Sequence, residues 1–152
     1  MNKGTLYLLL IFGINFCTGQ SIAVLKYDGG GDWYSNPTAL KNLINFCNTT
    51  IQTAIEEKPQ YVEVGSTAIF EYPFLHMTGH GNVTFSESDS KNLRMYLLSG
   101  GFLHIDDNYG MKTYVVKELK KVFPEKEMTE IPLSHSIYNN IYPFPKGLPK
   151  IH

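Results

Sequence analysis

The sequence predicts an α/β domain with a mostly parallel β-sheet that is covered by helices on both faces. Short apolar runs alternate with longer helical patterns along the chain, and residues 78–102 leave room for a helical crossover between two parallel strands. The composition suits a folded core because 43% of the residues are hydrophobic. The 13 basic residues nearly balance 14 acidic ones, so the chain has no basic footprint and no nucleic-acid partner is expected.

The first 20 residues are predicted to form a secretory signal peptide. Lys3 precedes the apolar stretch LYLLLIFGINF, and small residues follow in CTGQ. This stretch is too short to span a membrane comfortably, so the protein is not expected to be transmembrane itself. The domain over 21–152 would then be exported to the periplasm or the extracellular space. It would keep Cys47 as its single cysteine and form no internal disulfide.

Three strands and one helix are expected in the first half of the domain. Residues 22–27 and 61–65 are short apolar runs with β-branched residues, and a third strand within 72–81 ends at Gly79. The helix between the first two strands begins at Asn36 and Pro37, a favourable N-cap and first-turn pair. Its packed face is expected to carry Leu40, Leu43, Ile44 and Cys47.

The clearest helical pattern lies within 85–101. Ser86 and Asp89 form a capping-box pattern, Phe85 is placed as a hydrophobic staple, and Gly100 stands where a glycine commonly ends a helix. The remaining elements are a strand over 102–106, a helix over 110–123 and a fifth strand over 127–132. The expected sheet order is 2-1-3-4-5, that of a flavodoxin-like, doubly wound fold.

Polar, glycine-containing segments follow three of these strands, at 28–34, 78–82 and 106–110. In a doubly wound sheet the carboxyl ends of such strands meet at the point where the winding reverses, and ligands bind there. The catalytic candidates are Asp106, Asp107 and His80. The predicted ligand-binding residues are Gly29, Gly30, Gly31, Asp32, Trp33, Thr78, Gly79, Asn108 and Tyr109.

Each of these residues also has a structural interpretation. The glycines permit tight turns, and Asp106 or Asp107 is suited to cap the following helix. His76 and His104 alternate with apolar residues, which is typical of hydrogen-bonded residues in or near a core. No metal or cofactor is expected, because the glycines around HMTGH disfavour a zinc-binding helix. A metal site built from His80 with one of the two aspartates remains an alternative.

Several long motifs resemble the bacterial domain-of-unknown-function family 4159. They are YDGGGDWYSNPTAL, YPFLHMTGHGNVTFS, LRMYLLSGGFLHIDDNYGM, KKVFP and GLPKIH. The resemblance covers essentially everything after the signal peptide and implies a fold like that of the class I glutamine amidotransferases. Those enzymes carry a catalytic cysteine after the strand equivalent to 102–106, where this chain has Asp107 and Asn108, so glutaminase activity is not implied.

The family resemblance implies an exported or membrane-anchored protein, since its members often accompany aerotolerance-type proteins with von Willebrand-type domains. It transfers no activity. This chain departs from the family at Asp28 and Ser136, where a glycine and a proline are usual, and at its end, where the family domain normally continues. We therefore expect an incomplete C-terminal part and a module that binds a small-molecule or peptide ligand, with an envelope protein as a further partner. A hydrolase using Asp106 or Asp107 with His80 is the alternative function.

Overall fold

The computed structural model of the protein describes residues 20–148. The predicted signal peptide lies outside this range except for its last residue, and so it stays a prediction. None of the helices within 20–148 is long and apolar enough to cross a membrane.

Strands and helices alternate along the chain as expected. Their bounds are β1 (Ile22–Lys26), α1 (Ala39–Thr50), β2 (Gln60–Glu63), β3 (Phe74–His80), α2 (Glu87–Leu98), β4 (Phe102–Tyr109) and α3 (Lys112–Val122), with short 3₁₀ helices η1 (Thr67–Glu71) and η2 (Ser136–Tyr138). The four strands form one sheet in the order β2-β1-β3-β4, and every pair is parallel. The predicted α/β fold class and the order of the first four strands are confirmed.

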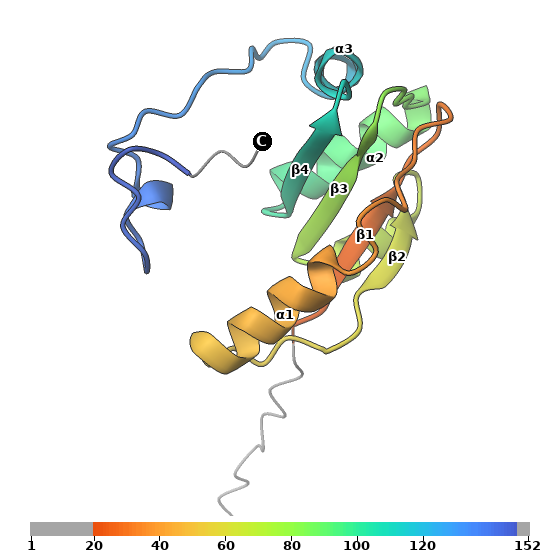
Figure 1. Cartoon of the computed structure of the whole chain (residues 1–152). Helices are drawn as coiled ribbons and strands as arrows, with labels where there is room; N and C mark the ends of the chain where they lie inside the picture. The colour runs from red at the N-terminus through yellow and green to blue at the C-terminus, as the bar shows by residue number, and fades with distance from the viewer. Residues whose placement is uncertain (1–19, 149–152) are drawn as a thin grey trace, which may run out of the picture.

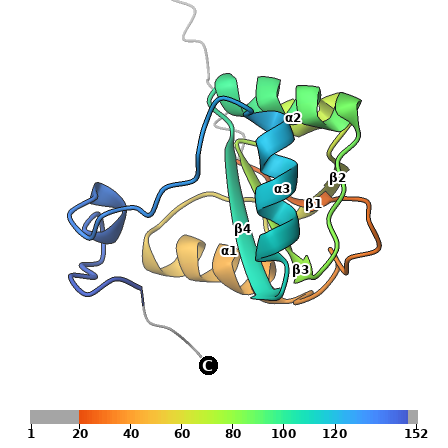
Figure 2. The same cartoon turned by 90° about the horizontal axis from the view of Figure 1, so that it is seen from above.

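Helices cover the sheet on both faces, as the views from the side and from above show (Figures 1 and 2). Alternate residues of β1 point to opposite faces, so Leu25 joins the core beneath α2 and α3 while Val24 packs with Leu40 and Ile44 of α1. The core beneath α2 and α3 is the larger of the two and contains Tyr96, which is 2% exposed. The smaller core positions α1 beside β1.

The capping box and the glycine stop predicted for α2 are present, whereas the predicted hydrophobic staple of Phe85 has no apolar partner at the N4 position, Ser90. The Ser86 hydroxyl accepts a hydrogen bond from the Asp89 N–H at 3.1 Å, and the Asp89 carboxylate accepts one from the Ser86 N–H at 2.9 Å. Phe85 is buried, and Gly100 has a φ of +98° directly after the helix. The capping box and the glycine stop therefore set both ends of α2.

The predicted fifth strand over 127–132 is wrong, because the chain after α3 is irregular. A turn from Phe123 to Lys126 follows the helix, and the Lys120 ammonium binds both the Lys126 carbonyl and the Glu127 carboxylate. These contacts hold the start of the segment against α3 and not against β4. Figure 2 shows the rest of the segment running away from the sheet beyond β4.

Two predictions about α1 are also wrong. Asn36 is not its N-cap: the helix begins after Thr38, and Asn36 has a left-handed φ of +55°. Leu43 is 42% exposed and Cys47 is only half-buried, so the packed face is narrower than the sequence pattern indicated. The side chain of Asn36 is used elsewhere, across the ends of the strands.

Candidate functional site

The segment between β1 and α1 crosses the carboxyl ends of β3 and β4. At the end of β3, the Asp32 carboxylate contacts His80. At the end of β4, the Asn36 amide donates to the Asn108 side-chain oxygen at 2.7 Å, and the Asn108 amide donates to the Ser35 hydroxyl at 3.0 Å. The predicted convergence of the three strand ends is therefore confirmed, and side-chain hydrogen bonds hold it together.

Asp32 binds His80 at two points. One carboxylate oxygen accepts the His80 backbone N–H at 2.6 Å, and the other lies 2.8 Å from the ring Nδ1. The hydrogen bond from the His80 backbone N–H, followed by the bond from its ring, lowers the pKa of the Asp32 carboxyl. An ionised Asp32 selects the imidazole tautomer with its proton on Nδ1, which leaves the Nε2 lone pair of this exposed side chain available.

The close approach of Tyr27 explains why glycine precedes His80. The Tyr27 hydroxyl donates to the Thr78 carbonyl at 3.0 Å, and burial together with the nearby Asp32 charge raises the pKa of Tyr27 to about 12. A Cβ on Gly79 would overlap that hydroxyl, and the φ of Gly79 is +151°. Only glycine lets the chain pass Tyr27 and turn the His80 N–H toward Asp32.

The glycine triplet serves a packing role. The Asp28 carbonyl accepts the Thr84 N–H at 2.8 Å, and a Cβ on Gly29 or Gly31 would collide with residues of the 82–84 segment. Gly30 has open space around it. The tight-turn interpretation accounts for this triplet, and its predicted ligand-binding role stays a prediction.

Asp107 caps α3. Its two carboxylate oxygens accept the Met111 N–H at 2.8 Å and the Lys112 N–H at 3.0 Å, so both are engaged by the backbone. It lies within β4, which pairs with β3 as far as Tyr109 and so runs three residues past the predicted strand end. Asp106 points to the opposite face and is exposed, and Tyr109 is 84% exposed at the strand end.

A small crevice lies beneath the crossing segment, on the face of the sheet that α1 covers. Its volume is about 20 Å³, enough for one water-sized group. The lining residues are Val24, Trp33, Tyr34, Ser35, Asn36, Pro37, Leu40, Pro59, Tyr61, His76 and Thr78. None of them is Asp, Glu, Lys or Arg, so the lining is mainly neutral and partly aromatic, with His76 as its one imidazole.

The Thr78 hydroxyl is the unusual group in this crevice. Thr78 is 1% exposed, and its Oγ1 has no hydrogen-bond partner among the described residues. A buried hydroxyl without a partner costs about 1–3 kcal/mol of desolvation free energy. Because Thr78 is also one of the lining residues of the crevice, its hydroxyl is suited to receive a hydrogen bond from a ligand group placed there.

His76 and His104 contact each other across β3 and β4. Their Nδ1 atoms lie 2.9 Å apart, and the two strands pair them in register. His76 is 5% exposed, whereas His104 is exposed. Burial and then the His104 charge lower the pKa of His76, and the Asp106 charge opposes them. His76 therefore fits the expected hydrogen-bonded residue of the core. His104 makes the same contact, but it is exposed.

The sequence predicted only part of this site. Of the proposed ligand-binding residues, Trp33 and Thr78 line the crevice, and Asn108 holds two more of its lining residues in place. Ser35, Asn36, Tyr61 and His76 line it but were not predicted. For His76 the signal was present, because residues two apart on a strand share a face and Thr78 was already a candidate.

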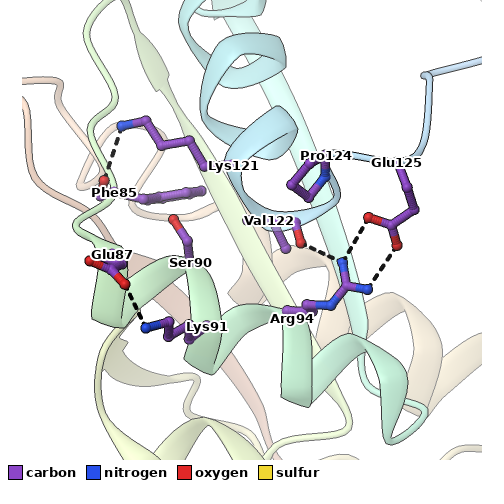
Figure 3. Close-up of a pocket in the computed structure, with 9 residues that line it drawn as sticks. All are labelled: Phe85, Glu87, Ser90, Lys91, Arg94, Lys121, Val122, Pro124 and Glu125. Carbon is purple, nitrogen blue, oxygen red and sulfur yellow. Dashed lines mark hydrogen bonds and ion pairs between the residues drawn. The ribbon is translucent and has the colours of Figure 1, made fainter.

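A second hollow of about 560 Å³ lies between α2 and α3 (Figure 3). Arg94 binds the Val122 carbonyl at 2.9 Å and Glu125 at 2.8 Å, and Lys121 binds the Phe85 carbonyl at 3.1 Å. The charged groups in Figure 3 are thus committed to partners within the protein: Glu87 and Lys91 pair within α2, whereas Arg94 connects α2 to the end of α3 and the turn after it. We regard this hollow as structural.

An open, mostly apolar groove of about 1040 Å³ lies between α3 and the outer edge of β4, where Met128 and Ile131 help to line it.

Among residues 20–148, no three His, Cys, Asp or Glu side chains are close enough together to hold a metal ion. The alternative metal site of His80 with Asp107 is also disfavoured by the engagement of both Asp107 oxygens with α3.

The chain matches the family described as "Domain of unknown function (DUF4159)" over residues 21–152. It therefore belongs to that family, as its motifs indicated. Comparison with curated proteins gives no match. The relationship to the class I glutamine amidotransferase-like superfamily stays a prediction.

Replacing Asp107 by alanine removes both acceptors at the start of α3. We expect the free energy of unfolding to fall by about 1 kcal/mol, the usual effect of losing a helix cap. Urea unfolding measures this loss. The matched control is Asp106→Ala, which removes the neighbouring exposed carboxylate and should change stability by less than about 0.5 kcal/mol. Equal effects of the two substitutions would contradict the capping role.

Proposed function

We propose that this domain is a binding module whose crevice receives an uncharged, hydrogen-bonding group of a small-molecule or peptide ligand. The observation that carries the proposal is the buried Thr78 hydroxyl, which has no partner among the described residues. The lining also contains neutral groups, including Ser35 and Asn36, together with the ring of Trp33. Binding sites commonly combine an apolar lining with a few placed polar groups of this kind.

The volume of the crevice supports insertion of one group and not of a whole ligand. About 20 Å³ accommodates a single hydroxyl or a similar polar atom. The exposed rings of Tyr34 and Tyr61, which are 65% and 54% exposed, lie at the same site and provide an outer surface for the rest of a ligand. Sugars and short peptides present hydroxyl or amide groups next to apolar surface, and they are the ligand classes that fit.

Exchange of Thr78 tests this proposal. N-acetylglucosamine and N-acetyl-alanine amide serve as probes, with binding followed by NMR chemical-shift changes of the crevice residues. We expect Thr78→Val to weaken binding about 3- to 10-fold, the usual worth of one hydrogen bond. Thr78→Ser keeps the hydroxyl and should retain binding. The proposal fails if neither probe shifts the crevice resonances, or if Thr78→Val binds as well as the original protein.

Hydrolysis is the second candidate function, favoured by one observation. The Asp32–His80 contact resembles the carboxylate–imidazole half of a catalytic triad, in which the carboxylate orients the base. A water molecule activated by Nε2 would be the nucleophile. The sequence had predicted Asp106 or Asp107 as the base, and of these Asp107 is less suited because it caps α3.

Assays with chromogenic ester and amide substrates test this second function. If His80 is the general base, His80→Gln should lower the rate about 10²- to 10⁴-fold, the usual contribution of such a group. His135→Gln is the matched control, since it removes a histidine from the segment after α3. No turnover, or turnover that survives His80→Gln, would leave binding as the function.

We also propose that the domain is exported and works in the cell envelope, where an envelope protein is its partner. The apolar N-terminal stretch after Lys3 and the family resemblance support this proposal. Mass spectrometry of the mature N-terminus in cell fractions tests it. Recovery of an intact Met1 terminus from the protein would contradict cleavage near residue 20.

A further inference from the structure

The rings of His76 and His104 lie edge to edge. Their planes are within 14° of parallel, their centroids are 5.2 Å apart and their Nδ1 atoms are 2.9 Å apart. The distance between the ring centroids is longer than the distance between the Nδ1 atoms by about two ring radii. The difference can be this large only when both Nδ1 atoms lie on the line that joins the two centroids. The nitrogens must therefore point directly at each other, in one plane.

This collinear arrangement is that of an N–H···N hydrogen bond with one shared proton. A metal ion would require both lone pairs to converge on a third point, which they do not. One Nδ1 must be protonated and the other must accept, so the contact forms when the pair is neutral or carries one positive charge. When both nitrogens are protonated, the contact becomes a repulsion between two cations.

The pair connects the crevice to the open part of the sheet. His76 lines the crevice beside Thr78, and His104 is exposed on β4, so protons reach the pair from the His104 side. Asp106 lies two residues along the same face of β4 and in register with Thr78, where its charge favours the singly protonated pair. The other titratable side chains of the crevice are Tyr34 from the segment before α1 and Tyr61 from β2, whereas β1 and α1 contribute Val24 and Leu40.

We propose that the His76–His104 pair is an acid-sensitive latch on the wall of the crevice. Uptake of a second proton would break the Nδ1 contact, separate the two rings and open the crevice at the β3–β4 side. The latch would regulate the ligand site described above and rests on that function for its purpose. Its operation can be measured without any ligand.

The direction of the pH effect follows from the burial of His76. Its pKa is lowered in the folded protein from 6.5, so the unfolded chain binds more protons just below that pH. The stability that the buried His76 gives the folded protein is therefore fully present above about pH 6.5 and is lost as the pH falls from there through the lowered pKa of the folded state. The Nδ1 contact itself breaks only when the pair takes up its second proton. Acid is thus the releasing condition.

NMR of the imidazole nitrogens tests the shared proton in the unaltered protein from pH 8 to pH 4. We expect a downfield Nδ1 proton and two separate titration steps for the pair, because the shared proton opposes uptake of the second one, with the buried His76 titrating below its ordinary pKa. Independent titration of both rings in that usual range would overturn the proposal. Because this measurement needs neither a ligand nor a variant, its failure is distinct from failure of ligand binding.

Fluorescence of Trp33 tests the opening of the crevice. Trp33 lines the crevice and is the only tryptophan in the chain, so its emission reports on this wall. We expect a change in emission that coincides with the second titration step and is lost in His104→Phe, which keeps an aromatic ring beside Phe74 but removes the nitrogen. His135→Gln, which removes a histidine from the segment after α3, is the matched control and should keep the change. An unchanged emission through that step, or the same change in His104→Phe, would overturn the latch.

Discussion

The arrangement of the site depends on the contact between Asp32 and His80. Asp32 lies in the segment after β1, and His80 ends β3, so one carboxylate joins this segment to a residue 48 positions further along the chain. It accepts a backbone N–H as well as a ring nitrogen, which fixes both the position of the segment and the orientation of the ring. A charged acceptor makes these hydrogen bonds stronger than neutral ones. The rest of the segment, including Ser35 and Asn36, is thereby brought over the crevice.

Several sequence features that looked independent are consequences of this crossing. Gly79 is required because Tyr27 passes too close for a side chain, and the glycine triplet is packed against the 82–84 segment. Asn36 adopts a left-handed conformation directly before α1 and donates across to Asn108 on β4. The turn, the strand ends and the start of α1 thus form one hydrogen-bonded unit. The polar residues that suggested a binding site also hold this unit together.

Short sequence patterns predicted those parts of the fold that depend on interactions between residues close together in the chain. The capping box of Ser86 and Asp89 and the order of the first four strands followed from short motifs and from the alternation of strands with helices. The fifth strand failed because its position was set by tertiary contacts, with Lys120 holding the segment after α3. The β4 boundary failed for a similar reason, since pairing with β3 extends the strand through polar residues.

The site was predicted at the correct edge of the sheet, but the side-chain contacts within it were not predicted correctly. Strand order and direction are sufficient to bring His80, Asp107 and the glycine segment to one edge. They do not say that Asp32, and not Asp107, contacts His80, because that choice depends on side-chain reach across the crossing segment. The inward-facing His76 and Thr78 were separable from ordinary core residues only once their hydrogen-bond partners, or the absence of one among the described residues, could be seen.

Hydrogen exchange at the backbone amide of His80 tests the central contact most directly. His80 itself is exposed, so its amide should exchange quickly unless Asp32 holds it. We expect clear protection in the original protein and at least a tenfold loss of that protection in Asp32→Ala, with α2 amides unaffected. Exchange of the His80 amide at the rate of an unstructured chain in the original protein would contradict the claim that Asp32 fastens the segment across the strand ends.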